Sequence, residues 1–397
     1  MILSDVCEFI VDCPHSTAPD EGKGYPLIRT PNVGKGRLDL NGVHRVSESV
    51  YKQRIQRGAP RANDLIFARE APAGNVALVQ ENQTVCLGQR TVLIRPNVQK
   101  VNPQYLVYYL LSPKPQYELL GTANGATVAH VNLPAIRNLK IELPEKSVQD
   151  KIGTILVTYD DLIENNQKQI KLLEEAAQRL YKEWFVDLRF PGHENTKIVD
   201  GVPEGWQYEK LGDLVKTTSG GTPSRRKSEY YVNGNIRWIK TKELNDRFIF
   251  ETEEHITEDA VKNSSAKVLP EGTLIVAMYG ATIGKIGITA AEMACNQACC
   301  AFISFDDMIS KEYLYCWLMD NREYLVSQGK GAAQSNLSQE MIRNFSLLCP
   351  DKKVIKNFTE IVTTMLENKR VLDNKILILS KARDDLLPKL MSGEVEV

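Results

Sequence analysis

The chain has 397 residues, which is enough for two domains that each bury their own core. A hydrophobic content of 43% and a charged content of 25% are ordinary for a globular protein, and a net charge of −1 argues against a protein that simply coats DNA. No apolar run approaches the roughly 20 residues that span a bilayer, and the opening MILSDVCEFIVDC lacks the basic start of a signal peptide, so we expect a cytoplasmic protein with no membrane partner.

Residues 1–145 are predicted to form a first globular α/β domain. Short apolar runs, PLIRT, DLIFA, NVALV and TVLIR, alternate with Pro- and Gly-containing segments, which is typical of strands and turns. One amphipathic helix is predicted near residues 103–111. The domain therefore mixes strands with a small amount of helix.

Residues 146–186 are different in kind, because their apolar residues recur at alternating steps of four and three. This spacing is a heptad pattern, and it predicts a long helix with one apolar stripe. The residues expected in that stripe, the seam of a helix pair, are Leu156, Ile163, Asn166, Ile170, Leu173 and Leu180. We interpret the polar Asn166 as a residue that fixes the pairing register.

After a linker at 187–205, the chain repeats this organisation. Residues 206–350 contain the strand-like runs IRWIK, TLIVA, KIGIT and CAFIS and a predicted helix near 311–320, and residues 351–391 contain a second heptad helix. Its expected seam residues are Met365, Asn368, Leu372, Leu379 and Leu386. Because a lone helix with one apolar stripe is marginal in water, we expect the two helices to pair with each other.

The two halves are copies of one unit. RNLKIELPEKSVQDKI at 137–152 recurs as RNFSLLCPDKKVIKNF at 343–358, so that Arg343 follows Arg137 by 206 residues. NDLIFAREAPAGNVALV likewise resembles GTLIVAMYGATIGKIGIT, and GATVAHVNL resembles GAAQSNL. The predicted fold is mixed α/β, with two repeated globular domains separated by two long antiparallel coiled-coil helices.

Motifs for catalysis or for cofactor binding are not evident. SGGTPSRRKS contains glycines but lacks the spacing of a P-loop, and no glycine-rich turn suits S-adenosylmethionine. Cys295, Cys299 and Cys300 lack a second pair at zinc spacing, so we interpret them as buried strand residues. We expect a non-catalytic chain with no metal and no cofactor of its own.

This architecture resembles the specificity subunit of type I restriction-modification enzymes. The resemblance rests on segments 137–152 and 343–358, on DLIFARE…GNVAL with its counterpart TLIVAMYGATIGKIGI, and on the closing LLPKLMSGEV at 386–395. It implies that each globular domain is a target recognition domain that reads half of a split sequence in double-stranded DNA. It also implies that the helix pair sets the spacing and docks two methyltransferase subunits, and that restriction subunits join the complex. S-adenosylmethionine, ATP and Mg²⁺ are then expected in the partner subunits.

Residues that contact DNA are expected among polar and basic side chains of Gly-rich loops near strand ends. The candidates are Arg29, Asn32, Lys35, Arg37, Arg69, Asn124, Thr127 and His130 in the first domain, and Lys240, Lys242, Tyr279, Lys285, Lys330, Gln334 and Ser335 in the second. For each of them, an ordinary exposed surface role is an equal alternative.

Two other classes of function stay open at this point. One is a self-contained DNA modification or restriction enzyme, and the other is a coiled-coil adaptor that binds only protein. Selection of a split motif from random DNA, methylation by the chain alone, and the absence of DNA binding would distinguish the three hypotheses.

Overall fold

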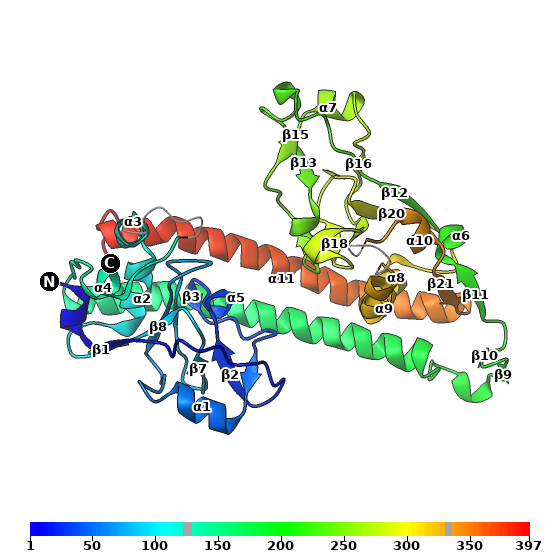
Figure 1. Ribbon diagram of the computed structural model, residues 1–397. Helices are drawn as coiled ribbons and strands as arrows, with labels where there is room; N and C mark the ends of the chain where they lie inside the picture. The colour runs from blue at the N-terminus through cyan, green and yellow to red at the C-terminus, as the bar shows by residue number, and fades with distance from the viewer. Residues whose placement is uncertain (122–128, 330–335) are drawn as a thin grey trace. The chain divides into compact units, whose positions relative to one another are not determined.

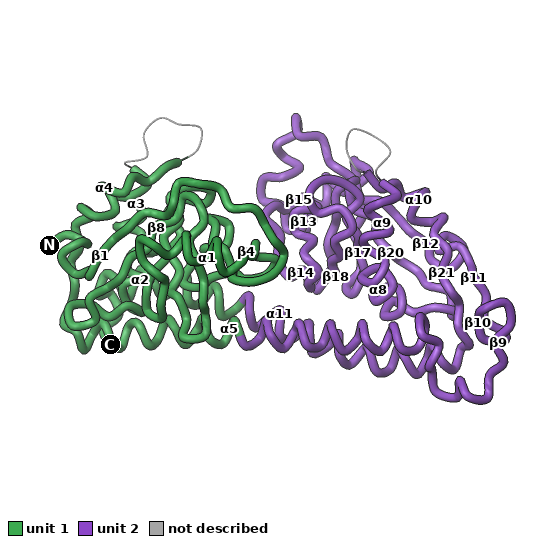
Figure 2. The backbone as a smooth tube through the Cα atoms, turned by 60° about the horizontal axis from the view of Figure 1, so that its bottom comes forward, with its two compact units in different colours: residues 1–164, 378–397 green, residues 165–377 purple. Residues whose placement is uncertain are grey.

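The computed structural model describes residues 1–121, 129–329 and 336–397 (Figure 1). The chain divides into two compact units, which are coloured separately in Figure 2. Unit 1 comprises Met1–Glu164 and Ile378–Val397, and unit 2 comprises Asn165–Leu377. Within the described ranges, no helix is both long and apolar enough to cross a membrane.

Unit 1 is built on a five-stranded sheet in which only one pair of neighbours is parallel. The strand order is β1 (Cys7–Asp12), β8 (Thr91–Pro96), β5 (Leu65–Ala68), β6 (Val76–Leu78) and β3 (Gly36–Arg37), with β3 parallel to β6. A smaller sheet has the order β4 (Arg45–Val46), β2 (Tyr25–Ile28) and β7 (Cys86–Leu87). The helices are α1 (Glu48–Arg54), α2 (Pro103–Leu111), α3 (Pro113–Gly121) and α4 (Leu133–Arg137).

Unit 2 repeats this topology. Its five-stranded sheet has the order β12 (Val215–Ser219), β20 (Cys299–Phe305), β17 (Leu274–Ala277), β18 (Ile286–Thr289) and β14 (Arg247–Ile249), and β14 is again parallel to β18. A second sheet has the order β15 (His255–Ile256), β13 (Ile236–Ile239), β19 (Met293–Cys295) and β16 (Val268–Leu269). The other elements are β9 (Ile198–Val199), β10 (Val202–Pro203), β11 (Gln207–Lys210), β21 (Ser346–Cys349), α6 (Leu211–Leu214), α7 (Glu258–Lys262), α8 (Lys311–Asp320), α9 (Arg322–Gln328) and α10 (Gln339–Arg343).

The central strands are apolar on both faces because each face is covered by a different layer. In β5, Leu65 and Phe67 pack against α2, whereas Ile66 and Ala68 pack against residues of the smaller sheet. The predicted amphipathic helices are confirmed as α2 and α8. Their N-caps agree with the sequence, since Asn102 accepts a hydrogen bond from the Tyr105 amide and Ser310 from the Tyr313 amide.

Two long helices follow the sheets: α5 (Lys146–Tyr181), extended by a short π-helix at Lys182–Val186, and α11 (Lys352–Ser392). In unit 1, Leu156 of α5 shares a hydrophobic cluster with Leu390 of α11, and Asp160 pairs with Arg383. Residue numbers therefore increase along α5 as those of their partners on α11 decrease, so the two helices are antiparallel in this unit.

The same direction holds in unit 2. Glu174 of α5 pairs with Lys369 of α11, and Tyr181, about two helical turns further on, lies 6.4 Å from Phe358 between ring centroids. Phe185 fills the end of this seam, at 4.9 Å from Phe358 and 4.8 Å from Tyr313. The predicted fold class, two repeated α/β domains with two long antiparallel helices, is therefore confirmed.

One repeat-equivalent position differs between the units. In unit 2, Phe185 packs against Tyr313 and Phe358. The corresponding residues of unit 1 are Tyr105 and Ile152. They line instead a groove of about 870 Å³ together with the C-terminal residues 388–397. The two units thus share their topology but differ in the side chains that pack at this position.

The seam of α11 differs from the sequence prediction. Asn368 is exposed, and its neighbour Lys369 is 1% exposed, so the buried series runs through Val362, Leu366 and Lys369. The prediction that Asn368 lies in the seam was wrong, because Lys369 is buried there through its ion pairs with Glu174 of α5 and Asp373 of α11. A search for apolar periodicity does not detect a buried lysine.

The other expected seam residues differ in how deeply they are buried. Fully buried are Leu156, Ile163, Asn166, Ile170 and Leu372, whereas Leu173, Leu180, Met365, Leu379 and Leu386 are half-buried. The half-buried positions lie at the margin of the stripe, which is therefore wider than a strict heptad seam.

Asp246 ties the start of β14 to the rest of unit 2. It adopts a left-handed backbone conformation with φ of 67° and accepts hydrogen bonds from Lys285, at 2.7 Å, and from the Ile286 amide and Arg322. Burial alone would raise the pKa of Asp246, but the charges of Lys285 and Arg322 lower that pKa below its usual range.

Replacing Phe358 with Ala should lower the free energy of unfolding by about 3–5 kcal/mol, because a fully buried aromatic ring is removed from a packed seam. The matched control is Ile361→Ala on the same helix, whose side chain is 41% exposed and should have only a small effect. Urea unfolding followed by tryptophan fluorescence measures both. Equal losses in the two variants would contradict the assigned register.

Asp246→Asn should reduce stability near neutral pH and lose this disadvantage in acid. A carboxylate whose folded pKa is lowered stabilises the fold above its unfolded pKa of about 3.9 and ceases to do so as the pH falls through the folded value. The difference in thermal unfolding midpoint between wild type and Asp246→Asn should therefore narrow below about pH 4. Glu292→Gln, an exposed change of the same charge, is the control, and a pH-independent difference for Asp246→Asn would refute the assignment.

Candidate nucleic-acid interface

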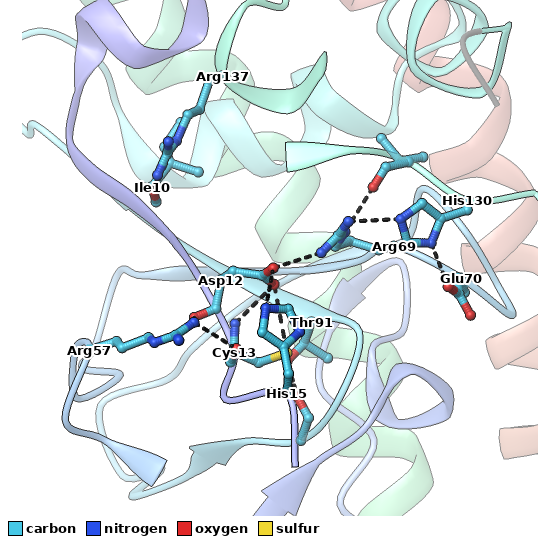
Figure 3. A network of polar contacts seen from close by, with 12 residues as sticks. Ile10, Asp12, Cys13, His15, Arg57, Arg69, Glu70, Thr91, His130 and Arg137 are labelled. Atoms are coloured by element: carbon cyan, nitrogen blue, oxygen red, sulfur yellow. Dashed lines mark hydrogen bonds and ion pairs between the residues drawn. The ribbon is translucent and has the colours of Figure 1, made fainter. Parts of the chain in front are cut away.

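In unit 1, a polar network gathers where the ends of three strands meet (Figure 3). Asp12 closes β1, Arg69 follows β5, and Arg90 precedes β8. His130 and Val131 follow Ala129, where the described chain resumes. Antiparallel order in the sheet brings these strand ends to one edge, so residues up to 119 positions apart in sequence become neighbours.

Arg69 is the centre of this network. Its side chain is 12% exposed and donates three hydrogen bonds: from Nε to the Val131 carbonyl at 2.8 Å, from Nη1 to Asp12 at 2.8 Å, and from Nη2 to His130 Nε2 at 2.7 Å. The Val131 amide donates in return to the Arg69 carbonyl at 3.0 Å. The guanidinium thus joins His130 and Val131 to Asp12 at the end of β1.

The hydrogen-bond pattern fixes the protonation of His130. A guanidinium can only donate, so Nε2 of His130 must accept, and the ring proton must then lie on Nδ1, where it is donated to Glu70. Glu70 also pairs with Arg90 at 2.8 Å. The contacts form a continuous row in the order Arg90, Glu70, His130, Arg69 and Asp12. The arginines donate, the carboxylates accept, and His130 does both.

The outward side of the network is basic. The side chains of Arg90 and His15 are 61% and 68% exposed, whereas the acids beneath them, Glu70 and Asp12, are 17% and 13% exposed. Arg57 is exposed nearby and donates to the Cys13 carbonyl at 3.1 Å. Solvent therefore meets cationic and imidazole groups, which are the side chains that contact phosphates and base edges.

The corresponding place in unit 2 can be identified from its backbone hydrogen bonds. The Leu337 amide donates to the Met278 carbonyl at 2.9 Å, as Val131 does to Arg69, and the Met278 amide donates to the Ala298 carbonyl at 2.8 Å, as Arg69 does to Arg90. Met278 is thus the counterpart of Arg69, and Ala298 that of Arg90. We call these two matched sets the stems: Asp12, Arg69, Glu70, Arg90, His130 and Val131 in unit 1, and Ser219, Met278, Tyr279, Ala298, Asn336 and Leu337 in unit 2.

The side chains on these equivalent stems have different chemistry. The counterparts of Glu70, His130 and Asp12 are Tyr279, Asn336 and Ser219. Met278 is buried, whereas Tyr279 and Asn336 are exposed. Unit 1 thus presents ionised groups at positions where unit 2 presents a phenol and an amide on the same backbone frame.

Of the sequence-predicted DNA contacts in unit 1, Arg69 and His130 lie together in this network. Arg29, Asn32, Lys35 and Arg37 lie elsewhere, around the 3₁₀ turn Thr30–Asn32 and β3. Asn32 is 7% exposed and accepts from the Arg29 amide at 3.1 Å. Arg37 pairs with Asp161 of α5, and Lys35 is exposed beside a small groove that Arg383 also lines.

In unit 2, Tyr279 lies on the stem, and the predicted lysines have acidic partners inside the chain. Lys240 pairs with Glu253 and Glu254, Lys242 pairs with Glu253, and Lys285 pairs with Asp246. The neighbouring carboxylate offsets part of each lysine's attraction for a phosphate. Asn124, Thr127, Lys330, Gln334 and Ser335 lie outside the described residues.

Sequence reasoning missed Asp12, Glu70 and Arg90 in unit 1 and Asn336 in unit 2. Two of these are acids, which a search for DNA contacts passes over. The usable signal was the repeat itself, since aligning DLIFARE with TLIVAMY places Arg69-Glu70 opposite Met278-Tyr279.

The cysteines of unit 2 are buried thiols. Cys295, Cys299 and Cys300 are free and fully buried, and burial raises the pKa of Cys300 to about 12, so this thiol is neutral. In the ranges that the structure describes, no group of three or more His, Cys, Asp or Glu side chains is placed to hold a metal ion.

Comparison with known proteins places the chain among DNA specificity proteins. The family model described as "Type I restriction modification DNA specificity domain" matches residues 1–175 and 203–377, once for each copy of the repeat. The MjaIX type I restriction enzyme specificity subunit of Methanocaldococcus jannaschii is 28% identical over 365 residues, covering 90% of this chain and 83% of its own length. The HindI specificity subunit of Haemophilus influenzae is 25% identical, covering 85% and 87%.

A solved structure agrees with this result at the level of the fold. The S subunit of a type I restriction-modification system from M. genitalium superimposes with a TM-score of 0.59 at 15% identity, covering 98% of this chain and 95% of that one. Since the family model covers most of the chain in two copies, the chain belongs to the type I restriction modification DNA specificity family.

Proposed function

We propose that this chain is the sequence-reading subunit of a type I restriction-modification complex, in which each unit reads one half of a split DNA target. The observation that carries the proposal is the pair of equivalent stems with different side chains. Two readers on one backbone frame, with different chemistry at matching positions, suit a target whose two halves differ in sequence.

The side chains on the stems are of the kinds that read DNA. Arg90 can donate to guanine or to phosphate oxygens, and Asn336 can donate to and accept from adenine. Tyr279, 38% exposed, can stack or donate through its hydroxyl. The acids beneath Arg90 and His130 orient these groups and leave the outward surface basic.

The remaining tasks are assigned to other parts of the complex. We place methylation and cleavage in partner subunits, which would supply S-adenosylmethionine, ATP and Mg²⁺. The paired helices α5 and α11 would set the spacing between the two half-sites and dock two methyltransferase subunits, and restriction subunits would join them. The chain itself would then be non-catalytic and cytoplasmic.

Selection from a random duplex pool tests this function. The chain is purified alone and with a co-expressed methyltransferase subunit, and the bound DNA is sequenced. Enrichment of two short motifs at a fixed separation supports the proposal. Methylation by the chain alone would indicate a self-contained enzyme, and absence of DNA binding in both preparations would indicate a protein-only adaptor.

Single substitutions on the two stems should affect separate half-sites. Arg90→Ala should relax or weaken recognition only in the half-site read by unit 1, and Tyr279→Ala only in that read by unit 2, each by about 1–3 kcal/mol at the affected positions. The readout is the selected motif and its binding constant at fixed salt concentration.

Lys52→Ala is the matched control, because Lys52 is exposed on α1 in an ion pair with Glu48. It should leave both half-sites unchanged. If Arg90→Ala changed the half-site that Tyr279→Ala also changes, the stems would not be independent readers.

A further inference from the structure

The seam of unit 1 contains a buried ion pair between the two long helices. Asp160 of α5, 2% exposed, pairs with Arg383 of α11, whose side chain is 15% exposed. Asp160 also accepts a hydrogen bond from the Tyr108 hydroxyl at 2.6 Å. A carboxylate this deeply buried depends on its partners, because removing one leaves an uncompensated charge.

Unit 2 contains a second ion pair between the same helices. Lys369 of α11, 1% exposed, lies 2.9 Å from Glu174 of α5 and 3.3 Å from Asp373 on its own helix. Asp373 in turn accepts from the Phe248 amide at 3.1 Å, so the acid is held by β14. Glu174 is therefore the partner that Lys369 finds across the seam.

Both pairs obey one antiparallel register. Glu174 follows Asp160 on α5 by the same two heptads by which Lys369 precedes Arg383 on α11. In both pairs α5 supplies the acid and α11 supplies the base. The two helices thus carry complementary charges at matched positions.

The repeat does not reproduce these charges. At the offset that relates Arg137 to Arg343, Asp160 corresponds to Leu366 and Arg383 to Ala177, and these two residues share a hydrophobic cluster in unit 2. Glu174 corresponds to Ser380 and Lys369 to Ile163. Each ion pair of one half thus has a neutral pair as its counterpart in the other half.

This asymmetry distinguishes two ways in which the helices could pair. If α5 of one copy met α5 of a second copy in the equivalent register, Asp160 would face Ala177 and Glu174 would face Ile163. If α11 met α11, Arg383 would face Leu366, and Lys369 would keep Asp373 but lose Glu174. Like-with-like pairing would therefore bury charges opposite apolar side chains.

We propose that Asp160, Glu174, Lys369 and Arg383 commit α5 to pair with α11, and that they oppose pairing between like helices of two copies. They are positioning residues for the helix pair. This inference depends on the seam alone, so it stands or falls separately from the proposed reading of DNA.

The experiment uses two full-length copies with different affinity tags, one carrying Lys369→Glu and the other Glu174→Lys. Inside the Lys369→Glu copy the new carboxylate meets Glu174 and Asp373, and inside the Glu174→Lys copy the new ammonium group meets Lys369. Each variant alone should therefore have a lower thermal unfolding midpoint than wild type. In a heterodimer, α5 of each copy can pair with α11 of the other. Glu174 of the Lys369→Glu copy then meets Lys369 of the Glu174→Lys copy, and the two substituted side chains, which also have opposite charges, meet at the other seam. Co-expressed copies should therefore co-purify as a heterodimer, at least about tenfold above two wild-type copies, which corresponds to 1.4 kcal/mol or more of preference.

The double variant Glu174→Lys with Lys369→Glu in one chain is the folding control and should recover a large part of the lost midpoint. Lys375→Glu, an exposed change on α11, controls for net charge. The proposal is overturned if the double variant is no more stable than the worse single variant, or if the single variants are destabilised but co-purify no more than wild type. If neither single variant is soluble alone, a soluble complex on co-expression supports the proposal, and its absence beside a folded double variant overturns it.

Discussion

A helix of 36 or 41 residues with one apolar stripe is not stable in water unless that stripe is covered. In this chain part of the cover for each long helix is the other one, although α5 ends and α11 begins 171 residues apart. The requirement that they meet explains why the two halves have kept the same frame. A change in length or register of one helix has to be matched in the other, whereas the strand ends are free of this constraint.

The strand ends show what that freedom permits. The same backbone hydrogen bonds join Arg69 to Val131 and Met278 to Leu337, so the frame of the stem is retained in both units. Only the side chains have changed, from an ionised network to a neutral set. A conserved frame with variable side chains at its edge is the arrangement in which one fold can present two different surfaces to two different ligands.

The elements were predictable from the sequence because their signals are local. Runs such as DLIFA have the length and composition of buried strands, and the caps Asn102 and Ser310 mark the helices that follow. The pairing of the two long helices was predictable because each carries one apolar stripe of similar length. These features depend on residues within a few positions of one another, or on a repeat that is visible by inspection.

The sequence did not predict which charged side chains pair with each other in the fold. Lys369 looks like a surface residue in its own helix, and it is buried instead of Asn368 because it pairs with Glu174 on another helix as well as with Asp373 on its own. Lys240 and Lys285 look available to phosphate until Glu254 and Asp246 are placed beside them. Pairs of this kind are fixed by the tertiary fold, and composition or periodicity does not contain them.

The two stems also differ in how they can evolve. Around Arg69, each charged side chain satisfies at least one other, so a single mutation there leaves a partly buried charge without its partner and destabilises the stem. Around Met278, the neutral side chains have no such mutual dependence, and one can change without penalty to its neighbours. New specificities should therefore arise in unit 2 by single mutations, whereas unit 1 would acquire them by recombination that exchanges the whole stem at once.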